Sequence, residues 1–293
     1  MQTVIKNSLK ARGLFVCRHP LHSRFNYEVS PYHVYEEKRC IDQGCVQFVW
    51  RCKIYGKSFH CPRGYKHVGR NCSSCKHYYE EKICRRPDLI VDPPAYEQYQ
   101  RQLEDYRWWL STVVGNKVPF SGIIDAVYPA LERTIDNGRS QTYLRGFLLS
   151  FESAYIGYDL FDDRIYMRVG GNFISRYQPA SGDHIDCLAR LQTDRGRVVM
   201  TNPVQVDFTQ KDDPQQITIS RAQVGRATGS IVIDDISKCR GCPYGALLDV
   251  EVIRPKRNRY RRFYCLRGVS RTQDCPIRLD WELDEYRNQP AEI

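Results

Sequence analysis

The distribution of cysteines constrains this chain more than any other feature. Of thirteen cysteines in 293 residues, eight lie between Cys17 and Cys84, four lie between Cys239 and Cys275, and Cys187 stands alone. Groups of eight, four and one cysteines are the numbers expected for two or three tetrahedral sites with four thiolate ligands each, plus one core cysteine. The pattern therefore predicts a protein organised by bound metal.

Disulfides are the alternative use of so many cysteines, but a disulfide framework requires secretion. The segment Met1–Lys6 has no apolar signal core, and no run of the chain approaches the roughly 20 apolar residues of a membrane helix. We therefore expect an intracellular, cytoplasmic protein with reduced thiols and no membrane partner.

Positive charge follows the cysteines. Residues 1–87 carry 17 Lys and Arg against 6 Asp and Glu, residues 88–253 carry 17 against 22, and residues 254–293 carry 10 against 6. The net charge of +10 is thus concentrated at the two cysteine-rich ends. A basic surface favours polyanions, so we expect a nucleic-acid partner, although a solvated face and a protein partner are compatible with the same charge.

Residues 1–87 form the first predicted domain, a cysteine-rich metal-binding domain. Metal ligation can supply the folding free energy that its few aliphatic residues cannot. The clearest local signal is the Cys72-Ser73-Ser74-Cys75 turn. One candidate ligand set joins this turn with Cys61 and Cys84, and the other comprises Cys17, Cys40, Cys45 and Cys52, unless the two sets interleave. Histidines are scattered among these cysteines: His19, His22, His33, His60, His67 and His77.

The last predicted domain, residues 237–293, contains a four-cysteine hairpin and an acidic tail. Its ligands follow the pattern Cys239-x2-Cys242-x22-Cys265-x9-Cys275, with apolar or alternating runs at 246–253 and 260–266 between them. A tight turn and a returning hairpin that together present four thiolates resemble a zinc ribbon, which implies structural Zn²⁺. A [4Fe–4S] cluster at one or more sites is the alternative, because Cys-Pro steps occur in cluster-binding sequences and recur here at Cys61, Cys242 and Cys275.

Between the two ends, residues 88–116 predict a linker helix and residues 117–236 predict β structure. Apolar residues recur at helical spacing from Ala95 to Val113, and Gly115 ends the pattern. Turn sequences at 136–139 and 194–197 separate short apolar runs. The expected strands are 120–127, 142–151, 164–169, 185–191 and 198–208, followed by β structure at 217–219 and 230–233.

The expected strands within residues 117–236 follow a distinctive order along the chain: three strands, a short link, and then a fourth and a fifth strand. The Gly182-Asp183 step opens the fourth strand, and Asp194-Arg195-Gly196-Arg197 leads to the fifth. This order resembles the OB-fold, a five-stranded Greek-key barrel that often binds oligonucleotides. The resemblance covers roughly a third of the chain and implies a barrel with single-stranded DNA or structured RNA as its ligand. Its candidate contact residues are Tyr143, Phe147, Phe151, Tyr166 and Arg168.

The hairpin of the last domain carries the most concentrated positive charge. Eight cations and no acid occur from 254 to 271, with aromatic residues among them. Arginine pairs with phosphate through two hydrogen bonds and aromatic rings stack on unpaired bases, whereas a solubilising hairpin tip would carry the same charge without a ligand. The predicted nucleic-acid contacts are Arg254, Lys256, Arg257, Arg259, Tyr260, Arg261, Arg262 and Phe263.

No catalytic signature occurs: the chain lacks phosphate-binding glycine loops, zinc-protease helices and nucleophile elbows. We therefore expect a mainly β, non-enzymatic protein that binds nucleic acid and is stabilised by metal. Two alternatives stay open. One is an iron–sulfur redox or sensor protein that partners a nucleic-acid-modifying enzyme, and the other is a structural assembly subunit.

Overall fold

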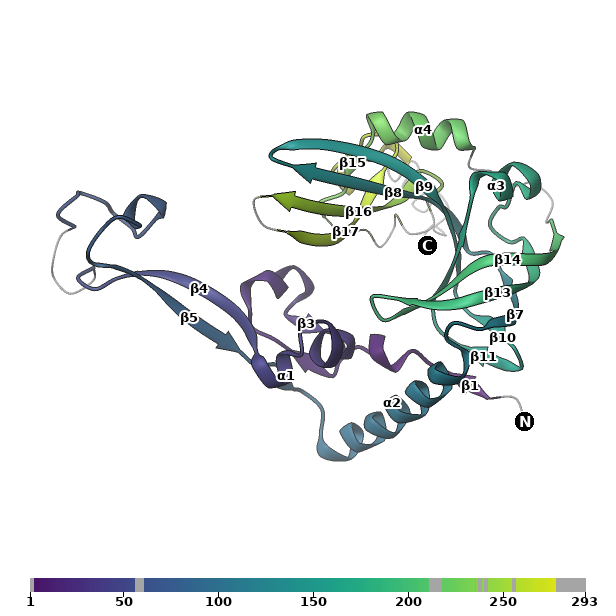
Figure 1. Ribbon diagram of the computed structural model, residues 1–293, viewed down its shortest axis with the longest axis horizontal. Coiled ribbons are helices and arrows are strands. Elements are labelled where there is room, and N and C mark those ends of the chain that lie inside the picture. Colours follow the sequence, from purple (N-terminus) through teal and green to yellow (C-terminus); the bar gives the residue numbers. More distant parts are fainter. Residues whose placement is uncertain are drawn as a thin grey trace, which may run out of the picture. The chain divides into compact units, whose positions relative to one another are not determined.

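The computed structural model describes residues 3–55, 61–210, 218–234, 236, 239, 242–254 and 257–277. Contacts divide the chain into two units (Figure 1). The sheet unit comprises Met1–Lys6 and Trp109–Ile293, and the cysteine unit comprises Asn7–Trp108. The expectation of a mainly β protein with a cysteine-rich N-terminal region is confirmed.

A twelve-stranded sheet forms the sheet unit. Its order is β1-β11-β10-β7-β13-β14-β12-β9-β8-β16-β17-β15, an open series with β1 and β15 at its edges rather than a closed barrel. The strands are β1 (Val4–Ile5), β7 (Lys117–Ile123), β8 (Ala126–Asp136), β9 (Arg139–Phe151), β10 (Ala154–Ile156), β11 (Asp159–Phe161), β12 (Ile165–Val169), β13 (His184–Asp194), β14 (Arg197–Thr209), β15 (Ser230–Ile231), β16 (Gly245–Arg254) and β17 (Asn258–Cys265).

Five strands at the centre follow the order β8-β9-β12-β14-β13. All neighbours are antiparallel except β12 and β14, which are parallel. The helix α3 (Gly171–Tyr177) connects β12 to β13. Asn137-Gly138 and Arg195-Gly196 turn the β8–β9 and β13–β14 hairpins, and all four residues have positive φ, as two-residue hairpin turns of this type require. The expected strand at 120–127 is divided at Ile124 and Asp125 into β7, which pairs with β13, and β8, which pairs with β9.

The core of the sheet unit is aromatic. Phe120 and Phe151 pack edge to face with ring centroids 4.9 Å apart, and Trp109 stacks on Phe161 at 5.5 Å. Phe147 is only 1 % exposed. Phe147 and Phe151 therefore stabilise the fold by burial of apolar area and do not lie on an exposed binding face.

One predicted strand in this unit is wrong. Ile219 begins the helix α4 (Ile219–Thr228), because the Thr218 side chain accepts a hydrogen bond from the amide of Arg221 and caps the helix. Ile217 lies outside the described residues. The expected hairpin, in contrast, is present as β16 and β17, which pair antiparallel over their length.

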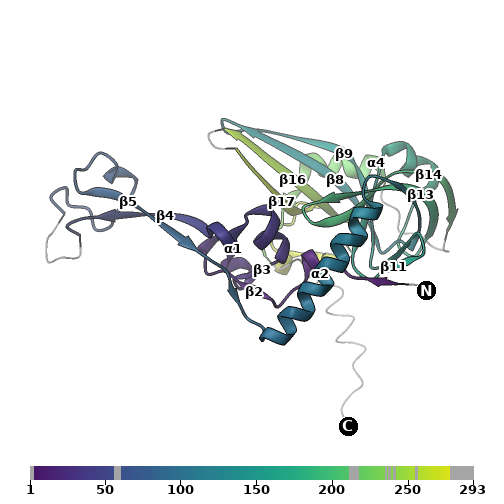
Figure 2. The same cartoon turned by 60° about the horizontal axis from the view of Figure 1, so that its bottom comes forward.

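In the cysteine unit, the longest feature is a two-stranded ribbon of β4 (Cys45–Cys52) and β5 (Tyr78–Arg85). We call the ribbon and the described residues between its strands the arm. Figures 1 and 2 show the arm extending from the short elements at its base. Those elements are η1 (Ser8–Lys10), β2 (Phe15–Val16), η2 (Pro20–Phe25), β3 (Glu28–Val29), η3 (His33–Glu37), α1 (Cys40–Gln43) and β6 (Asp88–Leu89), with η4 (Arg70–Cys72) in the arm.

The expected linker helix is α2 (Pro93–Val113), which begins at a proline pair, where missing amide hydrogens cost nothing. Tyr99 and Tyr106 are buried. Tyr99 donates a hydrogen bond to the carbonyl of Ser8 (3.3 Å), and the Ser8 hydroxyl donates to the carbonyl of Gln102 (3.1 Å). Among the described helices, even this 21-residue one lacks an apolar stretch that could cross a membrane.

Candidate metal centres

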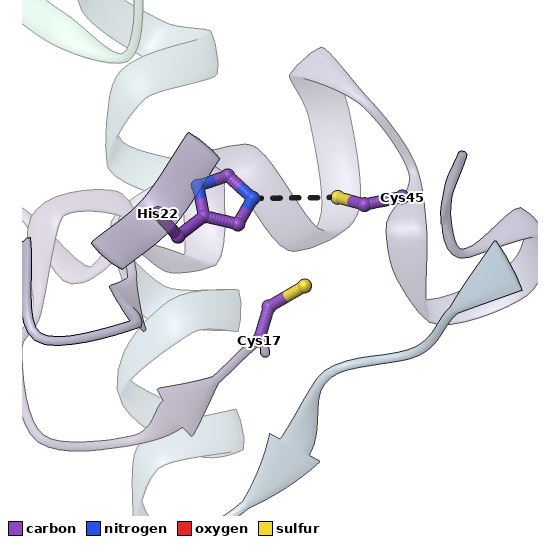
Figure 3. A group of neighbouring side chains, drawn as sticks. All are labelled: Cys17, His22 and Cys45. Carbon is purple, nitrogen blue, oxygen red and sulfur yellow. Dashed lines mark hydrogen bonds between the residues drawn. The ribbon is translucent and has the colours of Figure 1, made fainter. Parts of the chain in front are cut away.

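The base of the arm brings together sulfur and nitrogen atoms from four segments. Two groups of side chains have ligand atoms within 4.8 Å of one another, and both contain Cys45. One group is Cys17, His22 and Cys45, which Figure 3 shows, and the other is His33, Cys40 and Cys45. We call these five residues the base centre. Such a group can hold a metal ion.

Local structure explains how these side chains meet. Cys17 directly follows β2, and its amide donates to the carbonyl of Tyr27, which fixes the chain on either side of η2. Cys40 and Cys45 are separated by one helical turn that ends at Gly44. Gly44 has a φ of +72°, and a Cβ atom there would lie 3.2 Å from the backbone of Arg85. Only glycine fits this turn without strain, and the turn places both thiols on the same side.

The distances between these atoms match a shared ion. A sulfur at about 2.3 Å and a nitrogen at about 2.0 Å from one tetrahedral ion lie roughly 3.6 Å apart. Nε2 of His33 is 3.2 Å from Sγ of Cys45, and Nε2 of His22 is 3.5 Å from the same sulfur. Cys17 and Cys40 are fully buried, so the site is shielded from water on their side.

His33 is oriented by its neighbour. Its Nδ1 lies 3.4 Å from Oε2 of Glu37, one turn further along η3. Metal-binding histidines usually give their second nitrogen to such a carboxylate, which fixes the ring and raises its basicity. Burial lowers the pKa of His33, but hydrogen bonds to Cys40 and Glu37 outweigh burial and raise the pKa to about 9.

The other two histidines at the base differ from His33. Burial, with the nearby rings of His33 and His19, lowers the pKa of His22 to about 4, so its ring is neutral. His19 uses both nitrogens on backbone groups: Nδ1 accepts from the amide of Leu21, and Nε2 lies 3.2 Å from the carbonyl of Val46. His19 thus has no free lone pair for a metal, and its role is to hold η2 against β4.

A second set of four cysteines gathers at the tip of the arm. Cys52, Cys61, Cys72 and Cys75 all line one small cavity, together with His67. We call these four cysteines the tip centre. The amide of Cys75 donates to the carbonyl of Cys72 (2.8 Å), and the amide of Gly64 donates to the carbonyl of Cys61 (2.8 Å). Each hydrogen bond closes a tight turn of the kind that presents thiolates to a metal.

Arg63 joins the two turns of the tip. Its guanidinium group donates to the carbonyl of Asn71 (3.5 Å) and to the hydroxyl (3.2 Å) and carbonyl (3.4 Å) of Ser74. These bonds connect the Cys61 turn with the turn between Cys72 and Cys75. The turns are therefore held together by the protein as well as by any ion.

The eight N-terminal cysteines are thus distributed differently from the first expected pairing. The structure places Cys52, rather than Cys84, with Cys61, Cys72 and Cys75. Cys84 is exposed on β5 opposite Val46, outside both clusters of described residues. At the base centre, histidine nitrogens join the cysteine sulfurs as candidate ligands. The sequence contains a signal for this at His33, because Glu37 follows it by four residues and Cys40 follows it by seven.

The C-terminal four cysteines converge beside the sheet. Cys239 and Cys265 pack against the core cluster around Tyr128 and Phe263. Burial, followed by the charges of Cys242, Cys275 and Cys265, raises the pKa of Cys239 to about 11. Asp234 accepts hydrogen bonds from the amide and the hydroxyl of Thr272, which fixes the segment before Cys275. These four thiols form a third candidate, the C-terminal centre.

Four of the six predicted cationic contacts between residues 254 and 262 are already paired with carboxylates. Arg254 makes two hydrogen bonds to Asp136 (2.8 and 2.6 Å). Arg257 and Arg259 both donate to Oε1 of Glu251. These carboxylates neutralise guanidinium groups that would otherwise be free to bind phosphate.

The remaining members of this set vary in their surroundings. Arg261 is half-buried between Asp249 and Asp194 and donates to both (2.7–2.9 Å). Phe263 is buried against Tyr128, so its ring belongs to the core. Arg262 lies over the ring of Tyr260, 5.2 Å from its centre. Lys256 lies outside the described residues.

Comparison of this chain with protein-family models, with curated proteins and with solved structures finds no match.

Proposed function

We propose that this chain is a zinc-stabilised protein that binds single-stranded nucleic acid. The observation that carries the proposal is the coincidence of metal-ligand density with positive charge. Residues 1–87, which supply the base and tip centres, carry 17 Lys and Arg against 6 Asp and Glu. Metal ions would fix basic, poorly aliphatic segments in one conformation, and the ordered cations would bind phosphates.

Zinc suits the base centre better than an iron–sulfur cluster does. The nitrogen–sulfur distances of 3.2 and 3.5 Å are those of ligands around a single ion. A four-iron cluster holds its thiolates farther apart and is usually bound by four cysteines. Mixed sulfur and nitrogen ligation in tetrahedral geometry is typical of structural zinc. The tip and C-terminal centres each offer four thiols on tight turns, but among the described residues only the two groups of the base centre have ligand atoms within 4.8 Å of one another.

The topology of the sheet unit supports nucleic acid as the ligand. The order β8-β9-β12-β14-β13, with one parallel pair and a helix between β12 and β13, is compatible with a partly open OB-like barrel. Such barrels bind single strands by combining aromatic stacking with a basic groove. Here the aromatic residues Phe147 and Phe151 are buried. We therefore assign the sheet unit the role of a scaffold and place the phosphate contacts on the cysteine-rich segments.

Binding of the zinc-loaded, full-length protein to a fluorescent 20-nucleotide single strand tests the proposal. Fluorescence anisotropy at two salt concentrations should show binding that weakens as salt rises, because released counterions drive the association. Elemental analysis of the same sample should find zinc and no stoichiometric iron. Zinc-loaded protein that binds neither single-stranded DNA nor single-stranded RNA at low salt would refute the function.

A further inference from the structure

The arm displays aromatic residues that the fold itself does not use. Along β4, Val46, Phe48 and Trp50 point to one face of the ribbon, because alternate residues of a strand share a face. Phe48 is 60 % exposed and Trp50 is 44 % exposed. Water-exposed neighbouring aromatic rings on a two-stranded ribbon are costly unless a partner covers them.

The spacing of these rings suits bases. Residues two apart on a strand lie about 6.8 Å from each other, twice the roughly 3.4 Å rise of stacked bases along one strand. Phe48 and Trp50 can therefore each stack on a base of the same strand. Lys82 is the cross-strand neighbour of Phe48 and Glu80 is that of Trp50, so one cation and one carboxylate lie beside this aromatic face.

The tip of the arm supplies the positive charge. No Asp or Glu occurs from residue 43 to residue 79. The described cations of the tip are exposed, and none of them forms an ion pair within the described part of the chain. They are Lys53, Arg63, Lys66, Arg70 and Lys76. This surface differs from β16 and β17, where carboxylates neutralise Arg254, Arg257 and Arg259.

We propose that the arm is the surface that binds the nucleic-acid strand: Phe48 and Trp50 stack on bases, and the tip cations bind the phosphates that follow. This inference rests on the proposed function and gives it a location. The tip centre then has a direct role, since it fixes the loops that carry the cations.

Two arm variants of the full-length, zinc-loaded protein test the inference. The first, Phe48→Ala with Trp50→Ala, should weaken single-strand binding by at least about 25-fold with an unchanged salt slope, because each of the two stacked bases contributes about 5-fold or more. The second changes Lys53, Lys66 and Lys76 to Gln. It should lower the log–log salt slope by about 0.7 for each phosphate that is no longer neutralised, and so by up to about 2.1.

Matched controls lie in the sheet unit. Tyr155→Ala with Tyr158→Ala removes two aromatic rings that are 45 % and 93 % exposed. A triple Gln variant of the exposed Lys117, Arg139 and Arg190 removes the same charge as the arm variant. Both controls should bind as the unaltered protein does. Metal content is measured for every variant, since Lys53 and Lys76 adjoin Cys52 and Cys75.

The outcomes are distinguishable. If the unaltered protein binds and the arm variants bind equally well, or if the controls weaken binding as much, the arm is not the binding surface and the proposed function survives. Tighter binding to duplex than to single strand also overturns the inference. If the unaltered protein binds no nucleic acid, both the function and its location fail.

Discussion

The fourth ligand of the base centre is open to direct measurement. Two histidines approach Cys45, and we expect His33 to complete the site with Cys17, Cys40 and Cys45. Nε2 of His33 is the nearer to the shared sulfur, at 3.2 Å against 3.5 Å for His22, and only His33 has Glu37 to orient its ring. Structural zinc sites bind with about 10–16 kcal/mol in all, or roughly 3 kcal/mol for each of four ligands.

Loss of His33 should therefore weaken zinc binding at the base centre by about 100-fold, at roughly 1.4 kcal/mol for each factor of ten. Glu37→Gln, which keeps the ligand but removes its charged partner, should weaken binding by about 10- to 100-fold. His22→Ala should change the affinity less than about threefold. The loss of zinc affinity should thus be largest for His33→Ala, smaller for Glu37→Gln and smallest for His22→Ala. This order would identify His33 as a ligand, Glu37 as the residue that positions it and His22 as a neighbour that does not bind the ion.

Competition of zinc between the full-length protein and a coloured chelator measures these affinities. The tip and C-terminal centres serve as internal references, because any zinc that they hold should leave at unchanged chelator concentrations. If His22→Ala releases one equivalent of zinc while His33→Ala retains it, the ligand assignment is reversed. A Glu37→Gln variant with unaltered affinity would show that the carboxylate does not position the ring.

Three further predictions concern the sheet unit. Arg261→Met should lower the free energy of unfolding by about 2 kcal/mol in urea titrations. This loss is below the roughly 3–5 kcal/mol of a fully buried ion pair, because the carboxylate partners of Arg261 remain partly exposed. Arg259→Met, which breaks an exposed ion pair, should leave the free energy of unfolding unchanged. Burial raises the pKa of Asp194, but Arg261 outweighs burial, so the net pKa of Asp194 is lowered. Ionised Asp194 therefore contributes its full stabilisation above the ordinary pKa of 3.8, and this stabilisation disappears as the pH falls through the lowered pKa. Asp194→Asn should flatten the loss of stability measured between pH 5 and pH 2. Cys239→Ser and Cys265→Ser should each remove the same single metal equivalent by elemental analysis, and full stoichiometry in either variant would contradict a shared C-terminal centre.

Local patterns were sufficient to predict the β8–β9, β13–β14 and β16–β17 hairpins and the long helix. Asn137-Gly138 has the backbone preference for a two-residue turn, and the proline pair before Ala95 marks the start of α2. The helix α4 was missed because Ile219 looks like a strand residue, while the signal for a helix is the capping side chain of Thr218.

Contacts between distant residues could not be predicted in this way. The pairing of cysteines depends on β4, a strand that local sequence patterns did not identify, which puts Cys45 and Cys52 at opposite ends and so in different centres. Nor does the acid-free run from 254 to 271 reveal that Asp136, Asp194 and Glu251 come from elsewhere to neutralise its arginines. Local sequence shows where charge lies along a chain, but folding decides which charges remain free.

The length of β4 sets the distance between the base centre and the tip centre, since the strand starts at Cys45 of the base centre and ends at Cys52 of the tip centre. Seven steps of about 3.3 Å separate the two ends by roughly 23 Å. Removing two residues from each strand of the arm would shorten this separation by about 7 Å and keep every side chain on its face. Removing one from each would rotate the tip by half a turn relative to the aromatic rings of β4. The arm can therefore become longer or shorter without reorienting its tip only if each strand changes by an even number of residues.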